Sequence, residues 1–216
     1  KLMRGALLRF TESDAFERMK EGDVAELAYP TGLAADAVQV LRLSKQAKGA
    51  ALRKAGGKIG KSLLGKDILI LAGNRRFTSE LALGAALRAY EFVDHMSKEA
   101  QEGGALTVMM TNAHEIENTA ETIAAMVDGV FFTRDLVNEP SNVLTTVEFA
   151  DRLVALGELG VEVTVLDEPE LEKLGMRALL GVGMGSETPS KVVVMKWNGG
   201  EKDAAPLALI GKGVVF

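Results

Sequence analysis

The stretch Asn138-Glu139-Pro140-Ser141-Asn142 decides how the chain is divided. Proline has no amide proton to give to a helix, and its ring clashes with the preceding turn, so Pro140 ends a helix that runs into it. The two asparagines favour turns. We therefore expect a long helix before this stretch, and a domain boundary close to it.

The residues before the boundary alternate between strand and helix patterns. Residues 67–72 form a short continuous apolar run of the kind found in buried strands. Residues 37–43 and 106–110 are predicted as strands as well. Helices are expected at residues 46–64, 78–92, with Thr78 or Ser79 as its cap, and 115–136.

The first 30 residues carry weaker signals. Met3 to Phe10 is predicted as a strand, and Ser13 is expected to cap a short helix that contains Phe16. Pro30, followed by Thr31 and Gly32, indicates a turn.

The residues after the boundary continue the alternation. Thr146 is expected to cap a helix to about Leu156. The other expected elements are strands at 160–166, 191–197 and 206–210, and a short helix at 168–174. Strands that alternate with helices predict an α/β fold with a largely parallel or mixed sheet.

The composition is that of a soluble globular protein. Hydrophobic residues make up 47% of the 216 residues and charged residues 25%. The absence of cysteine excludes a disulfide framework and a thiolate zinc site, and fits a reducing cytoplasm. The net charge of −5 argues against a nucleic-acid footprint on the whole chain. No apolar run approaches the roughly 20 residues needed to span a bilayer, so we expect no membrane partner.

Two glycine-rich stretches look like nucleotide-binding motifs but depart from them. Residues 56–62 nearly match a phosphate-binding loop, but Ala55 stands where the first glycine is needed, and a helix pattern surrounds the stretch. Residues 181–186 have the spacing Gly-x-Gly-x-Gly and are not followed by an apolar helix. We expect a solvated helix end at the first stretch and a flexible turn at the second.

The candidate metal ligands of common type are scattered. His95 and His114 lie in no ligand spacing, and no Ser-His-Asp arrangement follows from two histidines. The glutamates between residues 115 and 121 suit the start of a helix, where carboxylates complement the helix dipole. The acidic cluster at residues 167–172 is expected to be solvated.

Lys212 is the cation with the most informative position. It lies between Gly211 and Gly213, directly after the apolar run Leu207-Ala-Leu-Ile. The carboxyl end of a strand in an α/β sheet is a common place for a site. On these residues alone, a ligand-binding lysine and a surface lysine are equally good interpretations.

Blocks of the second half resemble one known family. They are, in order, residues 134–145 (Arg-Asp-Leu-Val-Asn-Glu-Pro-Ser-Asn-Val-Leu-Thr), 160–167, 171–186, 192–200 and 207–216. In order and spacing they are similar to the leucyl aminopeptidase (M17 cytosol aminopeptidase) family across residues 131–216. Residues 1–130 are compatible with the family's variable N-terminal domain.

The resemblance implies a fold and an activity. It implies a macro-like α/β domain at residues 1–130 that ends in a linker helix, and the first part of a truncated α/β catalytic domain at 131–216. Members are cytoplasmic homo-hexamers that remove N-terminal residues from peptides with two divalent metals, Mn or Zn. By motif, Lys212 corresponds to a lysine that ligates one metal.

The resemblance also implies an incomplete site. In the family, the residue after the position of Phe216 is an aspartate that bridges both metals, and the other ligands and catalytic groups lie further on. We therefore expect this chain alone to bind no metal, to contain no catalytic residue and to be inactive. The alternatives are a macro-like module that binds a nucleotide or nucleic acid without peptidase activity, and an oligomerisation piece.

Overall fold

The computed structural model describes residues 2–215, with the side chains of all of them except Leu2, Glu115 and Ile116. These residues divide into two compact units, Lys1–Arg134 and Asp135–Phe216. The functional assignment of residues 1–130 and 131–216 to two domains stays a prediction.

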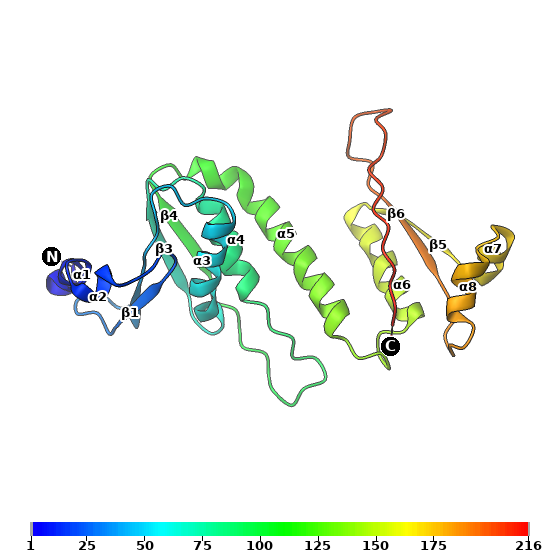
Figure 1. Ribbon diagram of the computed structural model, residues 1–216, viewed down its shortest axis with the longest axis horizontal. Helices are drawn as coiled ribbons and strands as arrows, with labels where there is room; N and C mark the ends of the chain where they lie inside the picture. The colour runs from blue at the N-terminus through cyan, green and yellow to red at the C-terminus, as the bar shows by residue number, and fades with distance from the viewer. Residues whose placement is uncertain (1, 216) are drawn as a thin grey trace. The chain divides into compact units, whose positions relative to one another are not determined.

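In its described part, unit 1 contains four strands, five α-helices and two short 3-10 helices. Figure 1 labels most of them. In chain order they are η1 (Leu2–Gly5), α1 (Ala6–Thr11), α2 (Asp14–Glu17), β1 (Val24–Ala28), β2 (Ala37–Leu41), α3 (Ala50–Gly60), η2 (Lys61–Leu63), β3 (Ile68–Gly73), α4 (Thr78–Arg88), β4 (Leu106–Met110) and α5 (His114–Asn138), whose last turn enters unit 2.

Unit 2 is smaller. In chain order its elements are α6 (Thr146–Val154), η3 (Ala155–Leu159), β5 (Glu162–Leu166), α7 (Glu168–Lys173), α8 (Arg177–Gly183) and β6 (Val192–Lys196).

The described strands pair two by two, so the class is α/β with small sheets. β3 and β4 are parallel, from Ile68↔Leu106 onward, with α4 as the crossover between them. The pairs β1–β2 and β5–β6 are antiparallel. The expected single larger sheet is thus replaced by three pairs in the described residues. The macro-like character of unit 1 stays a prediction.

The N-terminal segment corrects the sequence prediction. Met3 to Phe10, predicted as a strand, forms none: Met3 and Arg4 have left-handed backbone angles, and the helix α1 begins at Ala6. Alanine, leucine and arginine are good helix formers, and this segment is bonded to no strand. Ser13 caps α2 as predicted, because its Oγ accepts a hydrogen bond from the amide of Phe16 at 3.4 Å.

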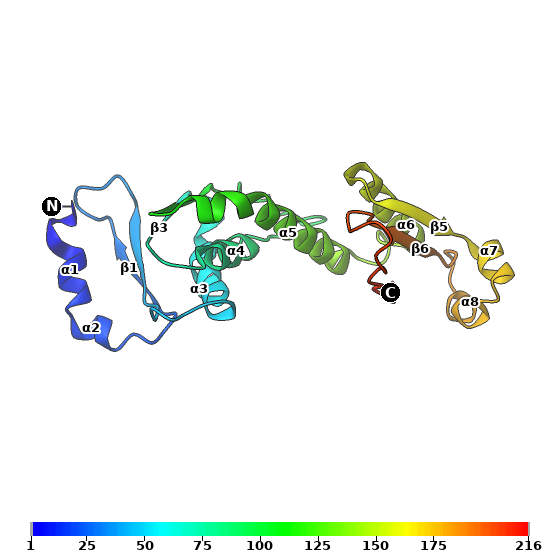
Figure 2. The same ribbon diagram turned by 90° about the horizontal axis from the view of Figure 1, so that it is seen from above.

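Helices α3 and α4 cross at very close range (Figure 2). A Cβ atom added to Gly56 would lie 2.0 Å from the carbonyl oxygen of Leu81, and one added to Gly60 would lie 2.0 Å from that of Ala85. On the other side of the crossing, a Cβ on Gly84 would lie 1.9 Å from the carbonyl oxygen of Arg53. The glycines that resemble a phosphate loop therefore allow two helix backbones to touch.

The core of unit 1 forms between these helices and the parallel strands. Its buried residues are Ala55, Ile59, Ile70 and Leu81, with half-buried aliphatic side chains of the strands packed around them. Leu52 on α3 is fully buried, at 0% exposure. The strand predicted at 67–72 thus corresponds to β3. The helix predicted at 46–64 corresponds to α3, and one of its faces is buried.

The start and end of α4 differ from the prediction. Neither Thr78 nor Ser79 is the cap, because Phe77 holds that position in the left-handed region, at φ 58°. The Thr78 hydroxyl instead donates to the carbonyl of Arg75 at 2.8 Å. The helix ends at Arg88, short of the expected Phe92.

Side chains near the end of α4 hold α5 in place. The rings of Tyr90 and Phe131 lie 5.1 Å apart, and the Arg134 guanidinium lies 5.2 Å from the Tyr90 ring centre. Arg134 also donates a hydrogen bond to the carbonyl of Leu87 at 2.8 Å. The long helix predicted at 115–136 is confirmed as α5.

Unit 2 corrects two further details. The cap of α6 is Thr145 rather than Thr146, since the Thr145 hydroxyl accepts from the amide of Glu148. Residues 181–183, predicted as a turn, are the end of α8.

The predicted strand at 206–210 is not formed. Leu207, Leu209 and Ile210 are 87%, 88% and 98% exposed. A strand needs a neighbour to pair its backbone groups. In the described residues this segment is paired with no strand, and the sheet of β5 and β6 has two strands only. No helix among the described residues is long and apolar enough to cross a membrane.

Candidate functional site

Lys212 is exposed and lies in a stretch without regular secondary structure. A Cβ atom added to Gly213 would lie 2.6 Å from Cε1 of Phe149 on α6. This contact explains why a glycine follows Lys212: the backbone passes directly over an aromatic ring. A Cβ on Gly211 would meet no atom within 4 Å, so packing does not explain that glycine.

The structure brings no set of metal ligands to Lys212. Within the described part of the chain, no three His, Asp or Glu side chains are grouped as a metal site. His95 and His114 belong to unit 1, and His114 Nδ1 lies 2.9 Å from the carboxylate of Glu117. Lys212 is thus the one candidate ligand carried over from the sequence. A single amine does not make a divalent metal site, and the described residues alone do not fit the pair of metals.

The acidic cluster at residues 167–172 has a structural use. Asp167 and Glu170 form a reciprocal capping box at the start of α7, where the amide of Asp167 donates to Glu170 Oε2 at 2.7 Å. Glu168 Oε1 accepts from the amide of Ser190 at 2.8 Å. Asp167, Glu170 and Glu172 are exposed, as the prediction of a solvated cluster requires. The hydrogen bonds add a structural role, because they fix the start of α7 and the residues before β6.

The glycine-rich stretch 181–186 is also fixed by packing. A Cβ on Gly183 would lie 2.0 Å from the hydroxyl of Ser190. The Thr146 hydroxyl on α6 donates to the carbonyl of Pro189 at 2.8 Å and lies 2.9 Å from the Thr188 hydroxyl. These contacts attach the loop before β6 to α6. Packing explains Gly183 alone, because a Cβ on Gly181 or Gly185 would meet no atom within 4 Å.

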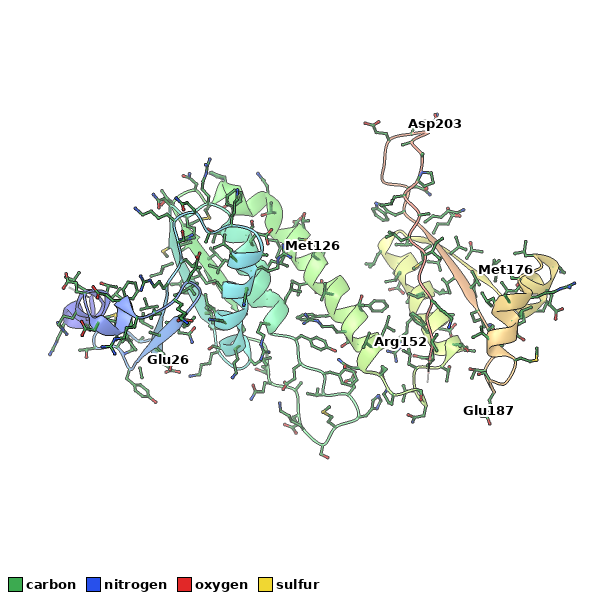
Figure 3. The ribbon with its side chains drawn as sticks, viewed as in Figure 1. Glu26, Met126, Arg152, Met176, Glu187 and Asp203 are labelled. Atoms are coloured by element: carbon green, nitrogen blue, oxygen red, sulfur yellow. The ribbon has the colours of Figure 1, made fainter. Side chains whose placement is uncertain are left out.

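Arg152 on α6 makes two ion pairs that the sequence analysis missed, and it is labelled in Figure 3. Its Nε donates to Glu148 at 2.9 Å and its Nη2 to Glu139 at 3.3 Å. The Glu139 side chain is only 5% exposed. The hydrogen bond to Glu148 is the main cause that raises the pKa of Arg152 above its ordinary value, and Glu139 adds to it.

This network positions the stretch that divides the chain. Because Glu139 belongs to the 138–142 turn, the Arg152 guanidinium ties that turn to α6. The signal available in the sequence was the four-residue spacing of Glu148 and Arg152, which places both side chains on one helix face. The pairing with Glu139 had no such signal.

Unit 1 contains a separate apolar groove of about 580 Å³ between α4, β4 and α5. Its lining includes Ala82, Leu106, Val108 and Val127, with Glu117 and Asp128 as its acidic members. No lysine or arginine lines it. Among the described residues, its lining therefore has no cation that would neutralise a nucleotide phosphate.

Comparison with known proteins gives a consistent result. The family model described as "Cytosol aminopeptidase family, catalytic domain" matches residues 131–216. A protein from Cereibacter sphaeroides named "Probable cytosol aminopeptidase" is 53% identical over all 216 residues, and one of the same name from Dinoroseobacter shibae is 54% identical. The match covers 100% of this chain and 44% of either relative, so the chain spans less than half of their length.

Two solved structures are similar in fold. A mutant of tomato leucine aminopeptidase matches with a TM-score of 0.75 and 20% identity, over 88% of this chain and 41% of that chain. The bottromycin maturation enzyme BotP in complex with Mn matches with a TM-score of 0.69 and 25% identity, over 90% and 42%. Both matches include most of unit 1 as well as unit 2, because 88–90% of the chain is covered.

Proposed function

The chain belongs to the M17 cytosol aminopeptidase family, and from this premise we propose that it is part of a metal-dependent aminopeptidase that removes N-terminal residues from peptides. The observation that carries the proposal is the similarity to the two bacterial relatives, which extends over the whole chain at more than half identity. The substrates are peptides with a free N-terminus, and the site of action is the cytoplasm. The complete enzyme is a homo-hexamer.

Lys212 is proposed to be a ligand of one of two divalent metals, Mn or Zn, in the complete enzyme. A lysine ligand must be a neutral amine, so metal binding there is coupled to loss of the ammonium proton. The paired metals would supply an activated water and polarise the scissile carbonyl. The exposure of Lys212 leaves its amine free to take part in a site built with further residues.

The 216-residue chain by itself is proposed to be inactive and to hold no metal. Among the described residues, no three His, Asp or Glu side chains are grouped so that they could hold a metal ion. The chain lacks the other carboxylates expected from the family, and no residue in it is assigned a catalytic role.

The test is to complete the chain. The chain is joined after Phe216 to the part of the Cereibacter sphaeroides relative that lies beyond the match, and hydrolysis of leucyl p-nitroanilide is measured with added Mn²⁺. We expect no hydrolysis by the 216-residue chain and clear hydrolysis by the chimera.

A substitution makes the test specific. Lys212→Ala should lower the activity of the chimera by about 100-fold or more, because even changes next to metal ligands cost 10–100-fold. Lys202→Ala, an exposed lysine in the same stretch, is the control and should leave activity unchanged. Hydrolysis by the 216-residue chain alone, or a fully active Lys212→Ala chimera, would overturn the proposal.

A further inference from the structure

The chain contains six asparagines, which differ in the residue that follows each of them. They are Asn74, Asn112, Asn118, Asn138, Asn142 and Asn198. Only Asn198 is followed by a glycine, Gly199. Asparagine is a thermolabile residue, because the main-chain nitrogen of the next residue can attack its side-chain carbonyl carbon. That attack requires a nitrogen that is free to move and that no side chain shields.

The structure protects four of the other five asparagines. After three of them, the attacking nitrogen already donates a hydrogen bond to a main-chain carbonyl, at 3.1, 2.9 and 2.9 Å. The donors are the amides of Arg75, Glu139 and Val143. Asn118 lies within α5, whose regular backbone keeps the next nitrogen away from the side chain. The nitrogen after Asn112 belongs to Ala113, and the methyl group of that alanine hinders the approach.

Asn198 has none of these protections. It lies in the irregular stretch directly after β6, and both Asn198 and Gly199 are exposed. In the described part of the chain, no hydrogen bond holds the Asn198 side chain or the Gly199 amide. Glycine has no side chain and adopts backbone angles that other residues avoid, so its nitrogen can turn toward the asparagine. Figure 3 shows the loop that follows β6, with Asp203 labelled in it.

The single tryptophan of the chain, Trp197, lies against this glycine. A Cβ atom added to Gly199 would lie 2.3 Å from Nε1 of Trp197. The tryptophan is 69% exposed, so water and hydroxide reach the stretch around it. Because the chain has no second tryptophan, the fluorescence of Trp197 reports on the backbone at Gly199 without an added label.

We propose that Asn198 is a site of spontaneous deamidation, with the nitrogen of Gly199 as the nucleophile. This nitrogen loses its proton to hydroxide and bonds to the side-chain carbonyl carbon of Asn198. The carbon–nitrogen bond of the side-chain amide breaks, and ammonia leaves with a proton taken from water. Water then opens the five-membered succinimide ring. Cleavage at the side-chain carbonyl gives aspartate, and cleavage at the main-chain carbonyl gives isoaspartate.

Both products change the loop that joins β6 to the stretch of Lys212. Each adds one negative charge to a loop that already contains Glu201 and Asp203. Isoaspartate also adds one carbon atom to the main chain, so the backbone at Gly199 shifts relative to the indole of Trp197. The modification does not depend on the peptidase proposal, because it uses residues of unit 2 alone.

The experiment incubates the 216-residue chain at mildly alkaline pH and follows every asparagine by peptide mapping and mass spectrometry, with isoaspartate separated from aspartate by chromatography. We expect Asn198 to be converted several-fold faster than the other five, at a rate that rises with pH, and the fluorescence of Trp197 to change at the same rate. Asn74 is the internal control, because it is also exposed. Unfolding in urea should raise the rate at Asn74, since it frees the amide of Arg75, and leave the rate at Asn198 nearly unchanged.

Two glycine variants test the nucleophile. Gly199→Ala should slow the conversion several-fold, because its methyl group shields the attacking nitrogen. Gly200→Ala is the matched control and should leave the rate unchanged, since a Cβ there would meet no atom within 4 Å and its nitrogen takes no part. Equal rates in the two variants would overturn the proposal. So would conversion of Asn198 no faster than that of Asn74 in the folded chain, or a rate at Asn198 that rises several-fold on unfolding.

Discussion

The stretches Gly60-Lys61-Ser62 and Gly211-Lys212-Gly213 look alike in sequence, yet the structure gives them different surroundings. Gly60 is buried at the crossing of α3 and α4, where no side chain has room. Lys212 lies in an exposed stretch of unit 2 that follows three almost fully exposed aliphatic residues. A glycine beside a lysine therefore says little by itself. What surrounds the backbone decides whether the glycine serves packing or leaves a lysine free for a ligand.

The largest expected effect is on the free energy of unfolding, when a buried leucine of unit 1 and an exposed leucine of unit 2 are each replaced by alanine. Leu52→Ala should lower the free energy of unfolding by about 3 kcal/mol, because a fully buried leucine leaves a cavity when it is truncated. Leu209→Ala, at an 88% exposed position, should change it by less than about 0.5 kcal/mol. Urea unfolding of both variants checks the comparison, and similar losses in the two would show that the segment 206–210 is packed in solution.

The next effect concerns the helix crossing. Gly56→Ala should lower the free energy of unfolding by about 2 kcal/mol, because the new methyl group meets the carbonyl oxygen of Leu81 and the helices must separate. Gly57→Ala is the matched control on the same helix, since its Cβ would lie 3.7 Å from the nearest atom. It should be neutral or stabilise by up to about 1 kcal/mol, as alanine favours helix. If Gly56→Ala were as stable as Gly57→Ala, the close crossing would be contradicted.

The predicted strands show which part of the fold can be predicted from the sequence and which part cannot. Apolar runs and alternation predicted the strands at 67–72, 106–110 and 160–166. These strands form because each pairs with another strand. The segment 206–210 has an equally good pattern but no partner, so it stays irregular. The hydrophobic pattern indicates which residues are apolar enough to be buried. Whether a strand forms depends also on a second strand that pairs with it.

The candidate site also has a residue that the sequence predicted and a contact that it did not. Lys212 was found from the blocks around it, since no local property of Gly-Lys-Gly identifies a ligand. Arg152 and its contact with Glu139 were missed, because the two residues are 13 positions apart and meet only when α6 folds back on the preceding turn.

The smallest expected effect is a pH dependence in unit 1. The amide of Lys20 donates to Asp23 at 2.7 Å and, with the hydrogen bond from Lys58, lowers the pKa of Asp23 below its ordinary value. A carboxyl group with a lowered folded-state pKa stabilises the fold above its unfolded pKa of about 3.9, and this contribution is lost as the pH falls through the lower, folded value. The Tm difference between the unchanged chain and Asp23→Asn should therefore be constant near neutral pH and shrink below about pH 4. A Tm difference that stayed constant down to pH 2 would speak against the Lys20 and Lys58 contacts.

The measurement that tests the central claim most directly is the metal content of the completed chimera with and without the Lys212 amine. After dialysis against Mn²⁺ and removal of free metal, elemental analysis should find close to two metals in each unchanged chimera chain. It should find a clear loss, toward one, in Lys212→Met, which keeps the length of the side chain but cannot act as an amine ligand. A Lys212→Met chimera that retains the same metal content as the unchanged protein would contradict the assignment of Lys212 as a ligand.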